Sequence, residues 1–153
     1  EDPLPVGVSY YNLAGTNPSV LPDFSGLTPI STGEMLQINL PSTGGAFGTS
    51  GLSDDVGAVF TGMIDFPDAG VWTLFTESDD GSKLMVDGTL VVDNDGLHGM
   101  VEVGGTIEVT EPGPIAVRVE FFERGGGAGL IVRWEGPGVS KSVVPSSAWR
   151  PVG

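Results

Sequence analysis

The chain has 153 residues, enough for one domain that buries about two-thirds of the surface its unfolded chain exposes. Its 20 acidic and 6 basic residues give a formal charge of −14, with no Lys or Arg in residues 1–82, which argues against nucleic acid or anionic lipid as a partner. Cysteine is absent, so disulfides, thiol catalysis and cysteine-bound zinc are excluded.

The composition favours an all-β protein, because 25 Gly and 12 Pro are spread among short segments rich in Val, Ile and Phe. A first strand is predicted over residues 6–11, followed by a proline-broken connection over 17–29. A short strand is predicted over 35–40. Residues 41–57, rich in glycine and serine, are the longest predicted loop, and long loops in compact domains are often functional.

Two hairpins are predicted in the middle of the chain. The first joins strands 58–66 and 71–79. The second joins strands 83–86 and 89–92 through Asp87-Gly88, a pair that suits the positive φ angles of a type I′ turn.

Three further strands are predicted after the second hairpin. Residues 101–109 alternate in polarity, with a bulge or bend expected at Gly104-Gly105. Residues 115–123 are the clearest half-buried strand, and Glu123 continues the phase of its apolar stripe. A carboxylate in that phase must find a partner or leave the core, because burying it unpaired is very costly. A glycine-rich loop leads into the last predicted strand, 130–134.

These strands predict a two-sheet antiparallel β-sandwich, formed as a single domain by residues 1–153. No apolar run approaches the roughly 18 residues of a membrane span, so we expect no membrane insertion. The first three residues lack a basic n-region, and we expect a piece excised from a longer secreted protein. The predicted core consists of Phe60, Ile64, Trp72, Leu74, Leu84, Val86, Leu90, Val92, Val117, Val119, Phe121, Leu130, Val132 and Trp134.

Asp79-Asp80-Gly81 closes one apolar strand and is either a solvated turn or part of a calcium site. Neighbouring side chains of a regular strand point to opposite faces, so both carboxylates would reach one ion only across an unusual backbone such as a cis peptide bond. Calcium takes six to eight hard oxygen ligands. Glu123 and the carbonyl groups of Gly125 and Gly127 are the candidates for completing such a set.

The order of motifs resembles the anthrax protective-antigen-type β-sandwich domain, a family that includes calcium-dependent lectin domains of yeast flocculins and epithelial adhesins and modules of bacterial adhesins and glycosidases. The resemblance covers nearly the whole chain. It is carried by Tyr10-Tyr11, Asp23-Phe24-Ser25, Phe66-Pro67, Gly70-Val71-Trp72-Thr73-Leu74, Ser78-Asp79-Asp80-Gly81-Ser82-Lys83-Leu84, Val86-Asp87-Gly88, Val91-Val92-Asp93, Gly96 and His98.

The resemblance implies that Asp79-Asp80 is the cis-linked pair of the first calcium loop and that residues 123–128 form the second. The second loop contributes one side-chain oxygen and two carbonyls, which implies Ca²⁺ ligation by Asp79, Asp80, Glu123, Gly125 and Gly127. Family lectins commonly carry an amide at the position of Glu123, so this chain departs from them there.

The resemblance also implies a lectin or adhesin module, extracellular or on the cell surface, and a monomer within a longer chain. Neutral glycans whose adjacent hydroxyls reach the calcium would be its partners. The alternatives are a structural or protein-binding spacer and an accessory carbohydrate-binding module of a glycosidase. The residues implied to contact sugar are Asp79, Asp80, Glu123, Arg124 and His98.

Other acidic and catalytic patterns are weaker. Asp54-Asp55 is interpreted as a solvated loop, Asp93 to Gly96 as a turn, and His98 as a polar loop contact rather than a zinc ligand. No nucleophile elbow or phosphate-binding loop occurs, and two carboxylates on one calcium cannot stand about 5–9.5 Å apart across a glycoside. We therefore expect no enzymatic activity.

Overall fold

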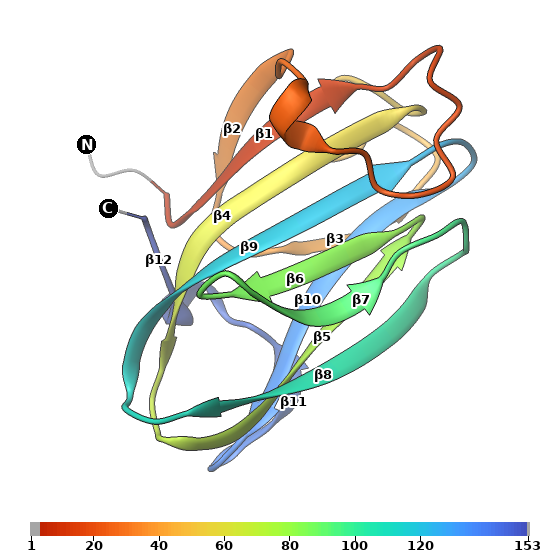
Figure 1. Ribbon diagram of the computed structural model, residues 1–153. Coiled ribbons are helices and arrows are strands. Elements are labelled where there is room, and N and C mark those ends of the chain that lie inside the picture. The colour runs from red at the N-terminus through yellow and green to blue at the C-terminus, as the bar shows by residue number, and fades with distance from the viewer. Residues whose placement is uncertain (1–3, 153) are drawn as a thin grey trace.

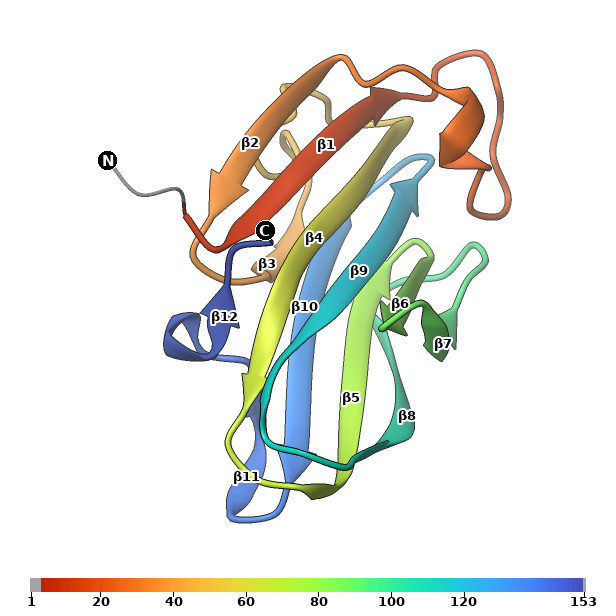
Figure 2. The same cartoon turned by 60° about the vertical axis from the view of Figure 1, so that its left-hand side comes forward.

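The computed structural model describes residues 4–152 and shows two antiparallel β-sheets packed face to face (Figures 1 and 2). Within these residues the only helical turns are two short 3₁₀ segments, Phe24–Gly26 and Ser146–Ala148. None of the described helices is long and apolar enough to cross a membrane. The predicted all-β sandwich is therefore confirmed.

The first sheet has seven strands in the order β2-β1-β4-β9-β6-β7, with β12 pairing with β4. Its longest pair joins β4 and β9 along their whole length. Its strands are β1 (Val6–Asn12), β2 (Ser31–Met35), β4 (Val56–Phe66), β6 (Ser82–Val86), β7 (Thr89–Asn94), β9 (Gly113–Glu123) and β12 (Trp149–Arg150).

The second sheet has five strands in the order β11-β10-β5-β8, with β3 pairing with β10. In Figure 2, β10 lies behind β4 and β9, with its sheet neighbour β5 beside it, so the long strands of both sheets enclose the core. Its strands are β3 (Asn39–Thr43), β5 (Gly70–Asp79), β8 (Val101–Val109), β10 (Ala128–Gly136) and β11 (Val139–Val143).

The core between the sheets is aromatic at one end. The centroid of the Trp72 ring lies 5.3 Å from that of Phe66 and 5.0 Å from that of Trp134. We call these three residues the aromatic end. Every predicted core residue is buried except Leu90, which is 48% exposed. That prediction was wrong because a register shift after Leu84 places Leu90 opposite Met85, on the outer side of the sheet.

The hairpin of β6 and β7 is confirmed, with φ of 49° at Asp87 and 79° at Gly88. The predicted hairpin of 58–66 and 71–79 was wrong, because β4 and β5 belong to different sheets. The predicted strand over 35–40 was wrong, because β2 ends at Met35 and the chain crosses to the other sheet before β3. Of the bulge or bend predicted at Gly104-Gly105, the bulge is absent, since β8 pairs with β5 without a register shift. Gly104 instead makes room for the ring of Phe75, which an added Cβ would meet at 2.8 Å.

Candidate cation and ligand site

Asp80 connects two loops at the end of the sandwich opposite the aromatic end. The peptide bond between Asp79 and Asp80 is cis, as the resemblance implies. The buried Asp80 carboxylate accepts hydrogen bonds from the backbone N–H of His98 (3.2 Å) and of Arg124 (2.9 Å). It therefore holds the segment after β7 and the segment after β9 against the end of β5. We call Asp79, Asp80 and Glu123 the acidic end.

A buried polar network supports this turn from inside the sandwich. Ser82 Oγ lies 2.7 Å from Ser78 Oγ and donates to Thr76 Oγ1 at 2.9 Å. The amide of Asn94 donates to the carbonyl oxygens of Thr76 (3.1 Å) and Val101 (2.8 Å). Sequence analysis did not single out this network, although Thr76 and Ser78 continue the inward phase of Trp72 and Leu74 along β5.

Glu123 is the most unusual residue of the site. Its side chain is fully buried on the inner face of β9, in the phase predicted from the sequence, and neither carboxylate oxygen has a hydrogen-bond partner among the described residues. Burial, together with the negative charges of Asp54, Asp80, Asp79 and Asp55, raises the pKa of Glu123 to about 8. A carboxylate in such surroundings is stabilised by a proton, a cation or a hydrogen-bond donor.

The glycine-rich loop after Glu123 runs close to Asp79. A Cβ added to Gly127 would lie 2.8 Å from Ser42 Oγ and 3.5 Å from Asp79 Oδ2, so the backbone here passes next to the Asp79 carboxylate. Gly126 has φ of +86°, a left-handed conformation that favours glycine. Gly125 faces open space. Burial and the charge of Asp80 raise the pKa of Asp79 as well.

His98 makes polar loop contacts, as predicted. Its ring nitrogens lie 2.8 Å from the carbonyl oxygens of Gly99 and Asn94. Burial by itself lowers the pKa of His98, but these two carbonyls and the charge of Asp80 raise it overall. The charged form of His98 is therefore more stable next to the Asp80 carboxylate than in a free imidazole.

A depression of about 400 Å³ opens over the acidic end. The Arg124 side chain at its edge donates to Asn17 Oδ1 at 3.4 Å. The structure thus brings Asp79, Asp80, Arg124, Gly125 and His98 around one opening and places Glu123 and Gly127 beside it. The depression is lined by Asp79, Asp80, Leu97, His98, Gly99, Arg124 and Gly125.

The model of the PA14 domain family matches residues 23–148, most of the chain. The chain belongs to the PA14 domain family. This confirms the resemblance read from the sequence, because PA14 is the protective-antigen-type domain. No match is found among curated protein sequences.

Solved structures share the PA14 fold. The PA14 sugar-binding domain from an RTX adhesin has a TM-score of 0.80 and 20% identity, with 99% of this chain and 100% of that one covered. The epithelial adhesin 9 A domain from Candida glabrata, in complex with Galβ1-3GlcNAc, has a TM-score of 0.71 and 8% identity, with 96% and 88% covered.

An anti-sigma factor domain-containing protein also matches, with a TM-score of 0.81 and 22% identity over 98% of this chain. The chain spans only about half of that protein, 48% of its length. At identities this low, the matches establish a common fold but do not show a common function. The function has to be argued from the site.

The donor atoms at the acidic end suit a hard cation. Among residues 4–152, no three His, Cys, Asp or Glu side chains stand close enough together to hold a metal by themselves. Binding would therefore need main-chain oxygens or a small side-chain movement. All candidate donors are oxygens, and the buried Glu123 carboxylate lacks a partner, so this PA14 domain fits calcium better than a softer metal.

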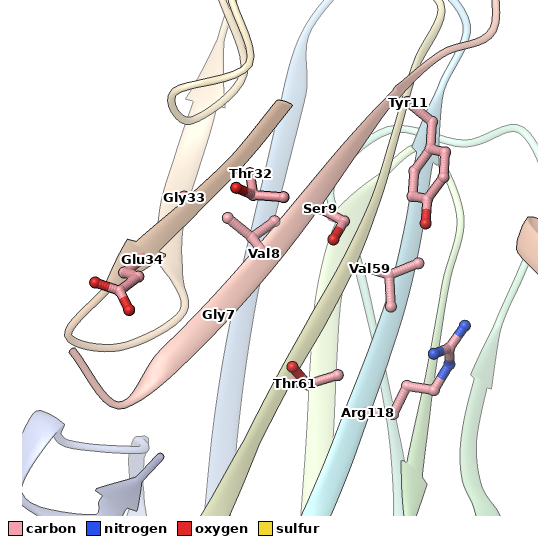
Figure 3. Close-up of a pocket in the computed structure, with 10 residues that line it drawn as sticks. All are labelled: Gly7, Val8, Ser9, Tyr11, Thr32, Gly33, Glu34, Val59, Thr61 and Arg118. Atoms are coloured by element: carbon pink, nitrogen blue, oxygen red, sulfur yellow. The ribbon is translucent and has the colours of Figure 1, made fainter. Parts of the chain in front are cut away.

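A larger hollow, about 710 Å³, lies on the outer face of the seven-stranded sheet. Figure 3 shows the side chains of Tyr11 and Arg118 pointing toward each other along this face, with Val59 between them. Arg118 is already paired with Glu120 at 3.0 Å, and none of the unpaired buried side-chain atoms of the described residues lies here. The hollow is larger, but the unpaired carboxylate oxygens of Glu123 lie at the acidic end.

Proposed function

We propose that this PA14 domain is a calcium-dependent carbohydrate-binding module. The observation that carries the proposal is Glu123, a fully buried carboxylate without a hydrogen-bond partner, next to the Asp79-Asp80 turn under an open depression. A purely structural role would favour an apolar or paired residue at this position, because an unpaired buried carboxylate destabilises a fold.

The residues of the acidic end would bind the ion and also contact the sugar. Asp79, Asp80 and Glu123, with the carbonyls of Gly125 and Gly127, would hold the ion. Bound calcium would offer its remaining coordination positions to two adjacent sugar hydroxyls. Asp79 and Asp80 would accept hydrogen bonds from those hydroxyls, since charged acceptors make the stronger bonds.

Arg124 and His98 line the same depression, and we expect both to contact the sugar. The backbone N–H groups of both residues donate hydrogen bonds to the Asp80 carboxylate. The proposed calcium site would therefore position the loops that carry Arg124 and His98. Sugar selectivity should therefore be sensitive to changes at Arg124.

Neutral saccharides with adjacent hydroxyls are the proposed ligands. A formal charge of −14 disfavours anionic glycans. The similar structures are consistent with this class, since one is named a sugar-binding domain and another holds a neutral disaccharide. Both belong to adhesins, which supports an extracellular or cell-surface setting, where multivalent display would compensate weak binding to single sugars.

A glycan array of neutral and acidic saccharides, probed in calcium and in chelator, tests this proposal. We expect retention on neutral glycans in calcium, loss in chelator, and loss on Asp79→Asn. Asp68→Asn removes the same charge from an exposed turn distant from the site and should bind normally. Retention in chelator would contradict the role of calcium, and calcium-dependent retention only on acidic polymers would contradict the sugar class.

The match to about half of an anti-sigma factor domain-containing protein favours one alternative, a structural or protein-binding module within a larger protein. Under this alternative the acidic end has no glycan ligand. Absence of calcium-dependent retention on every glycan of the array would favour it.

A further inference from the structure

Residues 13–23, which we call the connecting segment, join β1 to the first 3₁₀ turn. In Figures 1 and 2 this segment lies at the same end of the sandwich as the turns after β7 and β9. The backbone N–H of Leu13 donates to the carbonyl oxygen of Asp55 at 2.7 Å, and the N–H of Asp55 donates to the carbonyl oxygen of Arg124 at 3.3 Å. The start of the connecting segment is therefore fixed beside the loop after β9.

Asp95 holds the other end of the connecting segment. Its Oδ1 accepts hydrogen bonds from the backbone N–H of Leu21 at 2.9 Å and of Gly96 at 2.8 Å. A Cβ added to Gly81, the residue that follows the cis pair, would lie 2.8 Å from the same oxygen. The Asp95 carboxylate therefore lies directly against the turn of the acidic end, a contact that the interpretation of residues 93–96 as a turn did not anticipate.

Asn17, in the middle of the connecting segment, contacts the edge of the depression. Its φ of 49° lies in the left-handed region, which asparagine occupies more readily than most residues. Its Oδ1 accepts the 3.4 Å hydrogen bond from the Arg124 guanidinium. A guanidinium presents its N–H donors in one rigid plane, so a bond to one donor restricts the direction of the others.

Arg124 differs from the other arginines of the chain in its partner. Arg118, Arg133 and Arg150 each pair with a carboxylate. Among residues 4–152, the Arg124 guanidinium has no carboxylate within 4.0 Å and donates to an amide oxygen instead. Because Arg124 also lines the depression, its remaining donors are available to a ligand there.

We propose that the connecting segment determines which sugars bind at the acidic end. Asn17 orients the Arg124 guanidinium, and Asp95 holds the segment against the turn after β5. This inference rests on the proposed function. Hydrogen bonds are directional, so a guanidinium held in one orientation favours a sugar hydroxyl that points toward it over the epimer whose hydroxyl points away. Asn17 and Asp95 are positioning residues, and neither is a calcium ligand.

Titrations of the whole domain with methyl α-glucoside, methyl α-mannoside and methyl α-galactoside, all in calcium, measure this selectivity. The last two are epimers of the first at a single hydroxyl. We expect the wild type to prefer one of the three, and Asn17→Ala to reduce that preference about three- to tenfold, the range of one ordinary hydrogen bond. Calcium affinity measured without sugar should stay at the wild-type value.

Two matched variants accompany Asn17→Ala. Asn17→Asp keeps an oxygen acceptor for Arg124 and should preserve the wild-type preference. Asn39→Ala removes the same side chain from an exposed position on β3, outside the connecting segment, and should also behave as wild type. Asn17 is exposed as well, so we expect all three variants to fold.

Asp95 gives a second readout that needs neither calcium nor sugar. Asp95→Ala removes the acceptor for the Leu21 N–H, whereas Asp95→Asn removes the same charge and keeps an oxygen acceptor. Hydrogen exchange should show loss of protection of the Leu21 amide in Asp95→Ala and retention in Asp95→Asn. The sugar preference should fall in Asp95→Ala alone.

The outcomes separate this inference from the proposed function. A wild type with equal affinity for the three glycosides, or the same preference in Asn17→Ala and Asn39→Ala, would overturn the inference alone. Weaker calcium binding by Asn17→Ala without sugar would do the same, because Asn17 would then act on the ion. A wild type that binds none of the glycosides in calcium would overturn the proposed function and the inference together.

Discussion

The two ends of this sandwich share the same strands but differ in what fills the space between the sheets. Along β5, the inward side chains are Trp72 and Leu74 at the aromatic end and Thr76 and Ser78 towards the acidic end, and all four are fully buried. The aromatic end is stabilised by its own packing. The acidic end has a satisfied hydroxyl network and one carboxylate that nothing in the described residues satisfies.

The same change occurs along β9, where the inward stripe of Val117, Val119 and Phe121 ends in Glu123. Under the proposed function, this change from apolar to polar residues is where the interior serves the ligand. The aromatic end should therefore be indifferent to calcium, and the acidic end should depend on it. The following changes test that difference, starting with the largest effect.

Trp72→Ala should lower the free energy of unfolding by about 3–5 kcal/mol, as expected for loss of a large buried aromatic. The Trp72 indole also donates to the carbonyl oxygen of Asp68 at 2.9 Å. The loss should be the same in calcium and in chelator, measured by urea unfolding in both. A loss of stability that depends on calcium would show that the two ends are energetically coupled.

Asp80→Ala should abolish most of the rise in melting temperature that calcium produces. A ligand that binds only the folded state stabilises it by about 2.7 kcal/mol at a hundredfold excess over its Kd. Differential scanning calorimetry of wild type and variant, each in calcium and in chelator, measures the rise. Equal wild-type melting temperatures in calcium and chelator would contradict the proposed site.

Glu123 should make stability in chelator fall with rising pH. Its pKa is about 8 in the folded protein and near 4.5 when unfolded, so the folded state holds the extra proton between these values. The contribution is fully present below about pH 4.5 and is lost as the pH rises through about 8. Urea unfolding across this range in chelator measures it.

Glu123→Gln should flatten this pH dependence and weaken calcium binding, because it keeps the shape and removes the charge. Unchanged calcium affinity in the variant would remove Glu123 from the ligand set. An unchanged pH profile would show that the carboxylate is solvated or paired in solution.

Lys141→Ala should have the smallest effect. The Lys141 ammonium pairs with Glu102 and lies 4.3 Å from the centre of the Phe75 ring, on the outer face of the five-stranded sheet. Exposed pairs contribute about 0–1 kcal/mol, so the free energy of unfolding should change by less than about 1 kcal/mol, with calcium affinity unchanged. A measurable change in calcium affinity would connect this face to the acidic end.

Much of the fold follows from local patterns in the sequence. Alternation along 115–123 identified the inward stripe of β9, including Glu123, and Asp87-Gly88 identified a turn that needs two positive φ angles. Leu90 was misplaced because a register shift after Leu84 cannot be read from alternation alone.

Less of the site was predictable, because it is assembled from segments far apart in the chain. The Asp79-Asp80 pair and Glu123 carry recognisable motifs. The place of Asp55 beside the end of β9 depends on the pairing of β4 with β9, and the role of Asn94 depends on a hydrogen bond to Val101 across the gap between the sheets. Neither partnership has a local signature in the sequence.

A crystal structure grown in calcium, with an anomalous difference map, tests the central claim most directly. We predict one strong peak at the acidic end, within about 2.3–2.6 Å of oxygens from Asp79, Asp80 and Glu123. A map without a peak there, with the Glu123 carboxyl group still lacking any partner, would contradict the claim that this end of the domain is a calcium site.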